Sequence, residues 1–217
     1  TGAGTYTIAV QGTGNYTGTA EKTWTVTKAD MSVSAEDVKA TYDGTAYRIA
    51  VKAPEGAVIT YSTDGENYVT ETPVYIGAGV YIVHYQVTKA NYNTVTGSAA
   101  VIITARPITI TAEDQSKTYG DNDPAYTWKI VSGDLVSGDR LTGIAVTLTD
   151  SGEDAGSYVI TATQETGANP NYEIEFVDGE LTIERREISD AMVELGSELI
   201  ADGKTQTQEI QSVTVTN

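Results

Sequence analysis

Residues 78–87 read AGVYIVHYQV, a glycine-containing turn followed by an alternating strand. Successive side chains of a strand point to opposite faces, so Tyr81, Val83 and Tyr85 share one face. His84, the only histidine of the chain, falls on the other face. Because the larger apolar set favours the inner face, the pattern predicts a half-buried strand with His84 at the surface, and not a catalytic histidine.

The start of this stretch recurs along the chain. Ala-Gly-x-Tyr occurs at 3–6, 78–81 and 155–158, with spacings of 75 and 77 residues. Each copy is followed by a strand, an Asn-Tyr pair and a second strand, and another marker, Ala-Glu-Asp-x-x-x-Thr-Tyr, starts at Ala35 and Ala112. Repeats of this size suit separate modules, each with its own core.

The markers divide the chain into four parts. Residues 1–30 are the C-terminal part of a preceding repeat, 31–106 and 107–185 are complete repeats, and 186–217 are the N-terminal part of a following repeat.

Short strands rich in Val, Ile, Thr and Tyr alternate with turn residues in each complete repeat. Asp64-Gly65, between two alternating runs, is typical of a hairpin. Six or seven such strands per repeat predict an all-β fold of tandem small immunoglobulin-like β-sandwich modules, with β-grasp-like modules as the alternative. Only residues 133–143, GDLVSGDRLTG, leave room for a helical turn.

The recurring tyrosines have a structural interpretation. A Gly just before a Tyr at the start of a strand resembles the tyrosine corner of Greek-key sandwiches, in which the ring packs inward and the hydroxyl bonds back to the main chain. The Thr-Tyr marker places a further tyrosine at the first turn of each repeat. The residues expected to be structural are Tyr6, Tyr81, Tyr158, Gly4, Gly79, Gly156, Tyr42 and Tyr119.

Composition excludes several classes of function. The net charge of −17 disfavours nucleic acid and anionic lipid as partners. The absence of cysteine excludes disulfides, thiolate metal sites and a cysteine nucleophile. No apolar run approaches the roughly 20 residues of a membrane-spanning helix, so no membrane insertion is expected within this segment. An export signal or anchor is expected outside it.

Two stretches resemble repeats of bacterial surface proteins. AEDVKATYDG from Ala35, GAVITYSTDG from Gly56 and the following AGVY and Asn-Tyr resemble repeats of the YDG type. ITAEDQSKTYGDNDPAYTW from Ile110, continuing to residue 183, is similar to the related YGX-type repeats, called MBG domains. The resemblance implies tandem modules of large exported, adhesin-like proteins at the bacterial cell surface, without catalysis. It implies that neighbouring repeats of the same chain are partners. Whether a host protein or glycan is also bound stays unknown, and the resemblance identifies no binding residues.

The acidic stretch KTYGDNDPAY, residues 117–126, is the strongest candidate for a metal site. Asp121 and Asp123 offer oxygen donors to Ca²⁺, but local donors end at Ala125, whereas a Ca²⁺ loop requires several at alternate positions. Asp-Pro favours a turn. We therefore expect no cofactor and a solvated turn, with Tyr119 anchoring it and Asp121 capping it; a loose Ca²⁺ site is the alternative.

Aromatic residues offer a second candidate site. Tyr126 and Trp128 share a strand face and are either core residues, which is favoured, or a platform for a glycan. Trp24 is expected in a core. The predicted function is a non-catalytic stalk or adhesion-array segment, and the alternative is a glycan- or protein-binding accessory module of a large surface hydrolase. Lys–Asn isopeptide bonds, which are known in adhesin stalks, are a further option, and an intact-mass measurement would decide whether they form.

Overall fold

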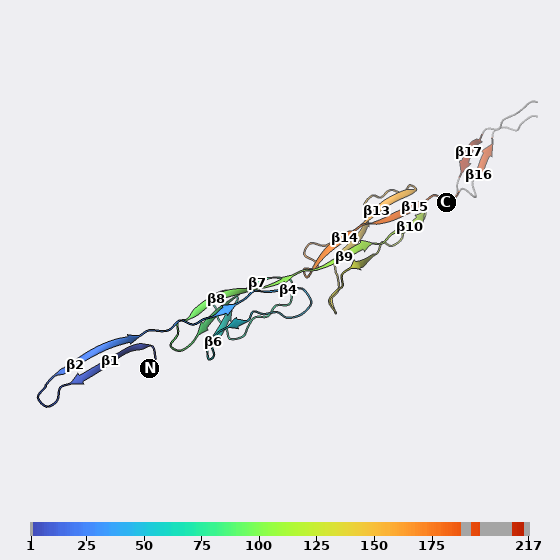
Figure 1. The fold of residues 1–217 in the computed structure, drawn as a ribbon. Helices are drawn as coiled ribbons and strands as arrows, with labels where there is room; N and C mark the ends of the chain where they lie inside the picture. The colour runs from blue at the N-terminus through green and yellow to red at the C-terminus, as the bar shows by residue number, and fades with distance from the viewer. Residues whose placement is uncertain (1, 188–191, 196–209, 215–217) are drawn as a thin grey trace, which may run out of the picture. The chain divides into compact units, whose positions relative to one another are not determined.

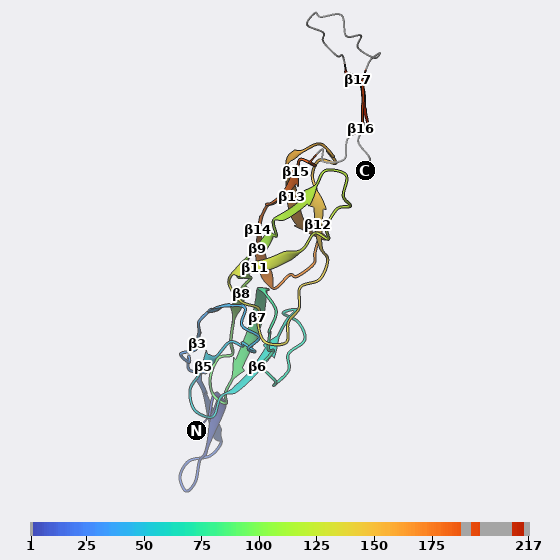
Figure 2. The same ribbon diagram turned by 90° about the vertical axis from the view of Figure 1, so that its right-hand side faces the viewer.

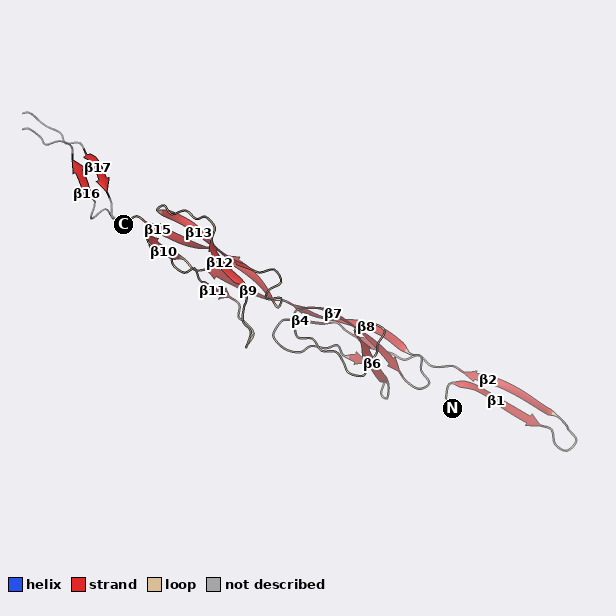
Figure 3. Cartoon of the chain, turned by 180° about the vertical axis from the view of Figure 1, so that it is seen from behind, coloured by secondary structure: helices blue, strands red, loops and turns tan. Residues whose placement is uncertain are grey.

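A computed structural model describes residues 2–187, 192–195 and 210–214. Every regular element in these ranges is a β-strand (Figure 3), which confirms the all-β prediction. Contacts divide the chain into two compact units. Unit 1 comprises Thr1–Pro107, Leu135–Arg140 and Asn169–Glu173, and unit 2 comprises Ile108–Asp134, Leu141–Ala168 and Ile174–Asn217. The units therefore differ from the repeats, since two short segments of residues 107–185 belong to unit 1.

Unit 1 begins with a hairpin of β1 (Gly4–Gln11) and β2 (Thr19–Val26) (Figure 1). These strands pair only with each other in the described part of the chain, so no second sheet covers them. Trp24 is 49% exposed here, and its ring stacks on Tyr6 with centroids 5.6 Å apart. It pairs with Tyr6 as fully buried Val101 pairs with Tyr81, so its core position in a complete repeat stays a prediction.

The main sheet of unit 1 has the order β4-β8-β7-β6. β4 runs parallel to β8, and the other pairs are antiparallel. A smaller sheet pairs β3 with β5, which lie side by side in Figure 2. The bounds of these strands are β3 (Ser34–Ala35), β4 (Val38–Thr41), β5 (Val51–Lys52), β6 (Val58–Ser62), β7 (Gly79–Thr88) and β8 (Val95–Thr104).

The alternation predicted for β7 is present. Val83 and Tyr85 are buried, whereas His84 is half-buried on the opposite face. The chain also reverses after β6 at Asp64-Gly65, where the Asp64 carboxylate accepts the amides of Glu66 and Asn67, each at 2.8 Å. These hydrogen bonds, with that from the Ser62 hydroxyl, lower the pKa of Asp64.

Unit 2 repeats the same arrangement. Its four-stranded sheet has the order β10-β15-β13-β12, with β10 parallel to β15, and a second sheet has the order β11-β9-β14. The strands are β9 (Arg106–Ala112), β10 (Gln115–Thr118), β11 (Trp128–Ser132), β12 (Ile144–Leu148), β13 (Gly156–Gln164), β14 (Tyr172–Val177) and β15 (Gly179–Glu184).

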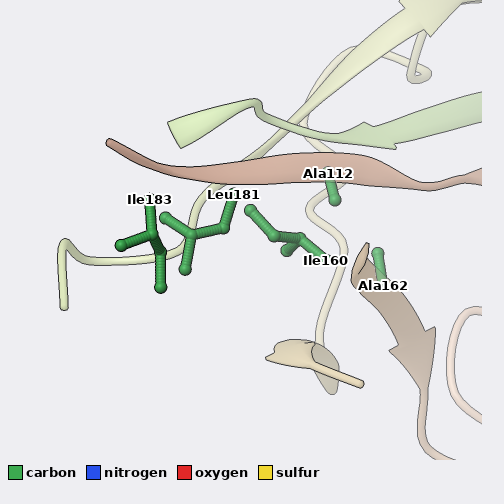
Figure 4. Close-up of a cluster of buried hydrophobic side chains, with 5 residues drawn as sticks. All are labelled: Ala112, Ile160, Ala162, Leu181 and Ile183. Carbon is green, nitrogen blue, oxygen red and sulfur yellow. The ribbon is translucent and has the colours of Figure 1, made fainter. Parts of the chain in front are cut away.

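The core of unit 2 lies between these two sheets. It gathers side chains from β9, β13 and β15 (Figure 4), namely Ala112, Ile160, Ala162, Leu181 and Ile183. Two sheets around one core, with an early strand parallel to the last, form an immunoglobulin-like β-sandwich. The β-grasp alternative requires a helix against the sheet, and none is present among the described residues.

Beyond unit 2's sandwich, β16 (Met192–Leu195) pairs antiparallel with β17 (Ile210–Thr214). The rest of the fragment expected at 186–217, apart from residues 186 and 187, lies outside the described residues. No helix long and apolar enough to cross a membrane is present in the described parts of the chain.

Candidate functional site

Three tyrosines form the same local corner. The hydroxyl of Tyr6 donates to Gly2 O at 2.6 Å, that of Tyr81 to Gly77 O at 3.1 Å, and that of Tyr158 to Asp154 O at 2.8 Å. In each case the acceptor lies four residues before the tyrosine. The bond closes the Ala-Gly-x-Tyr loop in a compact form, and the fold-specifying role of these tyrosines stays a prediction.

The glycines of these loops differ in their surroundings. A Cβ built on Gly79 would lie 2.9 Å from the Tyr81 hydroxyl oxygen, so the ring occupies the space that a side chain would need. Gly4 and Gly156 have open space at this position. Close packing against the tyrosine ring is therefore found at Gly79 alone of these three, and the structural role expected of all three stays a prediction.

The alanine of the loop is bound by a distant asparagine. Ala3 N donates to Asn91 Oδ1 at 2.8 Å, and Ala78 N donates to Asn171 Oδ1 at 2.9 Å. The partners lie 88 and 93 residues apart, and in both cases the asparagine belongs to the repeat that follows in the sequence. We call this interaction the alanine–asparagine contact.

Glycine before the alanine makes room for the asparagine. A Cβ on Gly2 would lie 2.7 Å from Asn91 Oδ1, and one on Gly77 would lie 3.2 Å from Asn171 Oδ1. The first distance is shorter than real Cβ contacts, and the second requires a displacement of a few tenths of an ångström. Glycine at this position therefore favours close approach of the asparagine side chain.

The main chain of each asparagine makes a further hydrogen bond. Ala29 N donates to Asn91 O and Arg106 N donates to Asn171 O, both at 2.9 Å. The asparagine thus binds the preceding loop with its side chain and the segment between two repeats with its carbonyl. All these groups are neutral, so the contact requires no ion or cofactor.

A cluster around Tyr42 completes the site in unit 1. Tyr42 is 5% exposed, and its hydroxyl donates to Asp139 Oδ2 at 2.9 Å. The Tyr172 hydroxyl donates to the same oxygen at 2.6 Å, and the two rings meet edge to face with centroids 5.7 Å apart. We call Tyr42, Asp139 and Tyr172 the Tyr42 cluster.

Electrostatics in this cluster keeps both phenols protonated. The hydrogen bond to Asp139 and then burial raise the pKa of Tyr42. Burial and then the hydrogen bond to Asp139 raise the pKa of Tyr172. Both hydroxyls therefore remain donors to one carboxylate oxygen, Asp139 Oδ2.

Asp139 lies in the loop of residues 133–143, for which the sequence analysis allowed one helical turn. The loop instead makes a tight turn in which Asp139 N donates to Val136 O at 2.9 Å. Gly138 has a φ of 95°, which a right-handed helix does not allow, so the helical interpretation is wrong. A Cβ on Gly44 would lie 2.8 Å from Val136 Cγ1, so glycine there admits this loop.

Tyr119, the counterpart of Tyr42, has a different environment. Its side chain is 42% exposed, so the ring is not packed inward as that of Tyr42 is, and the anchoring role of Tyr119 stays a prediction. The main chain holds the turn instead: Tyr119 N donates to Glu184 O at 2.8 Å, and Asp121 N donates to Thr118 O at 3.0 Å. Arg186 Nε also donates to Tyr119 O at 2.7 Å.

The two aspartates considered for Ca²⁺ face cationic side chains. Asp121 pairs with Arg186, and Asp123 Oδ1 lies 2.6 Å from Lys117 Nζ. Lys117, with a side chain 4% exposed, also contacts Glu153 Oε2 at 2.7 Å. These hydrogen bonds raise the pKa of Lys117, and Lys117 lowers the pKa of Asp123. No group of three or more acidic, His or Cys residues able to hold a metal occurs among the described residues.

The two aromatic residues considered as a platform are both half-buried. Tyr126 packs against the core of unit 2, and its buried hydroxyl has no hydrogen-bond partner within the described part of the chain. Burial raises the pKa of this phenol. Trp128 begins β11 opposite Ala112. Tyr126 is therefore turned toward the core, and a platform role for the pair stays a prediction.

The second repeat matches a known protein family. Residues 108–182 match the family profile described as MBG domain (YGX type). The MBG resemblance is thereby confirmed for the second repeat. Among solved structures, the I-band fragment I67-I69 from titin is 12% identical, with a TM-score of 0.29, over 85% of this chain and 75% of that chain. No curated protein matches the chain.

Proposed function

We propose that the chain is a non-catalytic tandem-repeat segment of an exported bacterial surface protein and serves as a stalk or adhesion-array module. The observation that carries this proposal is the alanine–asparagine contact, which recurs at Ala3–Asn91 and Ala78–Asn171. Each contact ties a loop of one repeat to the repeat that follows. A segment whose repeated chemistry joins successive modules is suited to spacing and presenting other domains.

The composition is compatible with an extracellular location. The formal charge of −17 keeps such an array soluble and disfavours its collapse onto anionic surfaces. The lack of cysteine leaves the folded state independent of redox conditions. Neighbouring repeats are the partners in this proposal, and an unknown host protein or glycan would be bound elsewhere in the array.

Surface labelling of the source bacterium tests the proposed location. An antibody raised against residues 107–185 should label intact cells as strongly as permeabilised cells, and external protease should remove the signal. An antibody against a cytosolic protein is the control for cell integrity. Labelling that requires permeabilisation would contradict the proposal.

A second candidate is a glycan- or protein-binding accessory module of a large surface hydrolase. Trp24 is the residue at which to test it: its ring is 49% exposed and stacks on Tyr6 at 5.6 Å, although the equivalent residue of the next repeat, Val101, is fully buried. Exposed aromatic faces are the usual platform for flat apolar ligands. Binding on a glycan array that disappears in Trp24→Ala, with unchanged circular dichroism, would favour this candidate over a purely structural stalk.

A further inference from the structure

The third Ala-Gly-x-Tyr loop, at 154–158, has the corner of the first two but no asparagine. Its tyrosine hydroxyl bonds to the carbonyl four residues earlier at 2.8 Å, as in the other loops. Ala155 is exposed, and no hydrogen bond from its amide is found within the described part of the chain. Among the described residues, the alanine–asparagine contact is therefore made at two of the three loops, and none of these residues accepts the Ala155 amide.

The turn tyrosines show the same difference. Tyr42, covered by Tyr172 and Asp139, is 5% exposed, whereas Tyr119 is 42% exposed. The two positions are equivalent, since each follows the strand that runs parallel to the last strand of its sheet. The exposed surface of Tyr119 thus corresponds to the surface of Tyr42 that Tyr172 and Asp139 cover.

The occupied sites indicate what the missing partner is. In both, the asparagine comes from a repeat C-terminal to the alanine, 88 or 93 residues farther along. We propose that Ala155 and Tyr119 form a docking site for the Asn-Tyr turn of a further repeat of this type, C-terminal on the same polypeptide. The Ala155 amide donates to the asparagine side-chain oxygen, and the Tyr119 ring packs against the tyrosine.

One residue distinguishes this site from the other two. Asp154 stands where Gly2 and Gly77 stand in the first two loops. A Cβ on Gly77 would lie 3.2 Å from Asn171 Oδ1, so Asp154 admits an asparagine only after a small displacement. Docking at the third loop is therefore weaker than at the second, and Asp154→Gly strengthens it. The incoming loop must also avoid a clash with the side chain of Asp121, which forms an ion pair with Arg186.

This inference rests on the proposed role as a tandem repeat, and an experiment in solution separates it from the cellular location. A second copy of residues 105–184 is inserted between Glu184 and Arg185, which keeps the register of Thr104 and Ala105. The copy carries Tyr119→Phe, so that nitration followed by peptide mass spectrometry reports only the original Tyr119. Nitration of Tyr119 should be at least about tenfold slower than in the parent chain, as for a docking free energy of about 1.4 kcal/mol.

Matched variants decide whether docking causes the protection. Asn171→Ala within the inserted copy should restore the parent rate, and Asp154→Gly in the original repeat should slow nitration further. Equal rates with and without the insert, while the urea m value shows that the added repeat is folded, would overturn the proposal. Slow nitration of Tyr119 in the parent chain would overturn it too, because the site would then already be covered.

A peptide provides a test that does not depend on folding of the insert. A synthetic peptide of residues 167–175 is added at millimolar concentration to the full chain carrying Asp154→Gly. Chemical-shift changes at the Ala155 amide, absent with the Asn171→Ala peptide, support the docking site. If the inserted repeat fails to fold and the peptide leaves this amide unchanged, the proposal is wrong. Surface labelling of cells is unaffected by either outcome.

Discussion

At the scale of the residue, the corner tyrosines show what one hydroxyl contributes. A neutral hydrogen bond of this kind adds about 0.5–1.5 kcal/mol to the free energy of unfolding. The bond joins atoms four residues apart in Tyr81 and Tyr158, so it needs no distant part of the chain. That local geometry is why the Ala-Gly-x-Tyr motif alone was enough to predict it.

Removal of a corner hydroxyl should therefore have a small and measurable effect. Tyr81→Phe and Tyr158→Phe should each lower the free energy of unfolding by about 1 kcal/mol in urea titration. Tyr16→Phe is the matched control, because Tyr16 is 79% exposed and its ring is solvated. An equal effect of all three substitutions would show that the corner bonds contribute nothing specific.

The ion pair of Lys117 gives a prediction with a defined pH dependence. Lys117 lowers the pKa of Asp123, so this carboxylate adds stability above its unfolded pKa of about 3.9 and loses it as the pH falls through the folded value. Asp123→Asn should lower the urea midpoint at pH 7, and the difference from wild type should shrink below about pH 4. Asn122→Ala, which replaces an exposed neighbour without an ionisable group, should show no such trend. A difference for Asp123→Asn that persists at pH 2 would contradict the assignment.

At the scale of the element, burial alternates along each central strand. On β13, Ile160 is fully buried whereas Val159 is 48% exposed, although both are β-branched neighbours. Ile160→Ala should cost about 2–5 kcal/mol of unfolding free energy, the range for a large-to-small change in a packed core. Val159→Ala should stay within about 0.5 kcal/mol. Urea unfolding of the two variants measures the contrast, and similar losses would place the core on both faces of the strand.

Strand patterns in the sequence predict which residues form strands better than they predict which strands are covered by a second sheet. Alternation identified the buried face of β7 because that pattern is local to ten residues. Trp24 shows what alternation leaves out, since a strand's apolar face is buried only where a second sheet lies against it, and β1 and β2 pair only with each other among the described strands. Asp139 was missed for a related reason: its partner Tyr42 lies 97 residues away, and its loop has no periodicity. The Asn-Tyr pair, which recurs in the first three repeats, was the available signal for the alanine–asparagine contact.

At the scale of the whole molecule, repeats and compact units do not coincide. Leu135–Arg140 and Asn169–Glu173 pack into unit 1, yet each is flanked on both sides by chain that belongs to unit 2. If unit 2 unfolds, these segments become parts of long flexible loops, and holding them in place then costs loop-closure entropy. The alanine–asparagine contact at Ala78 should therefore depend on the stability of unit 2.

Hydrogen exchange in the Ile160→Ala variant tests this dependence. The substitution lies in unit 2, but exchange of the Ala78 amide in unit 1 should accelerate about 30-fold or more, as for a loss of at least about 2 kcal/mol. The Val101 amide, in the core strand β8 of unit 1, is the control and should exchange at its wild-type rate. Acceleration at Ala162 without acceleration at Ala78 would mean that the Asn171 turn stays bound when the rest of unit 2 opens. Equal acceleration at Val101 would mean that the two units unfold together. Acceleration at Ala78 without acceleration at Val101 is expected if the stability of unit 2 keeps the Asn171 turn in place.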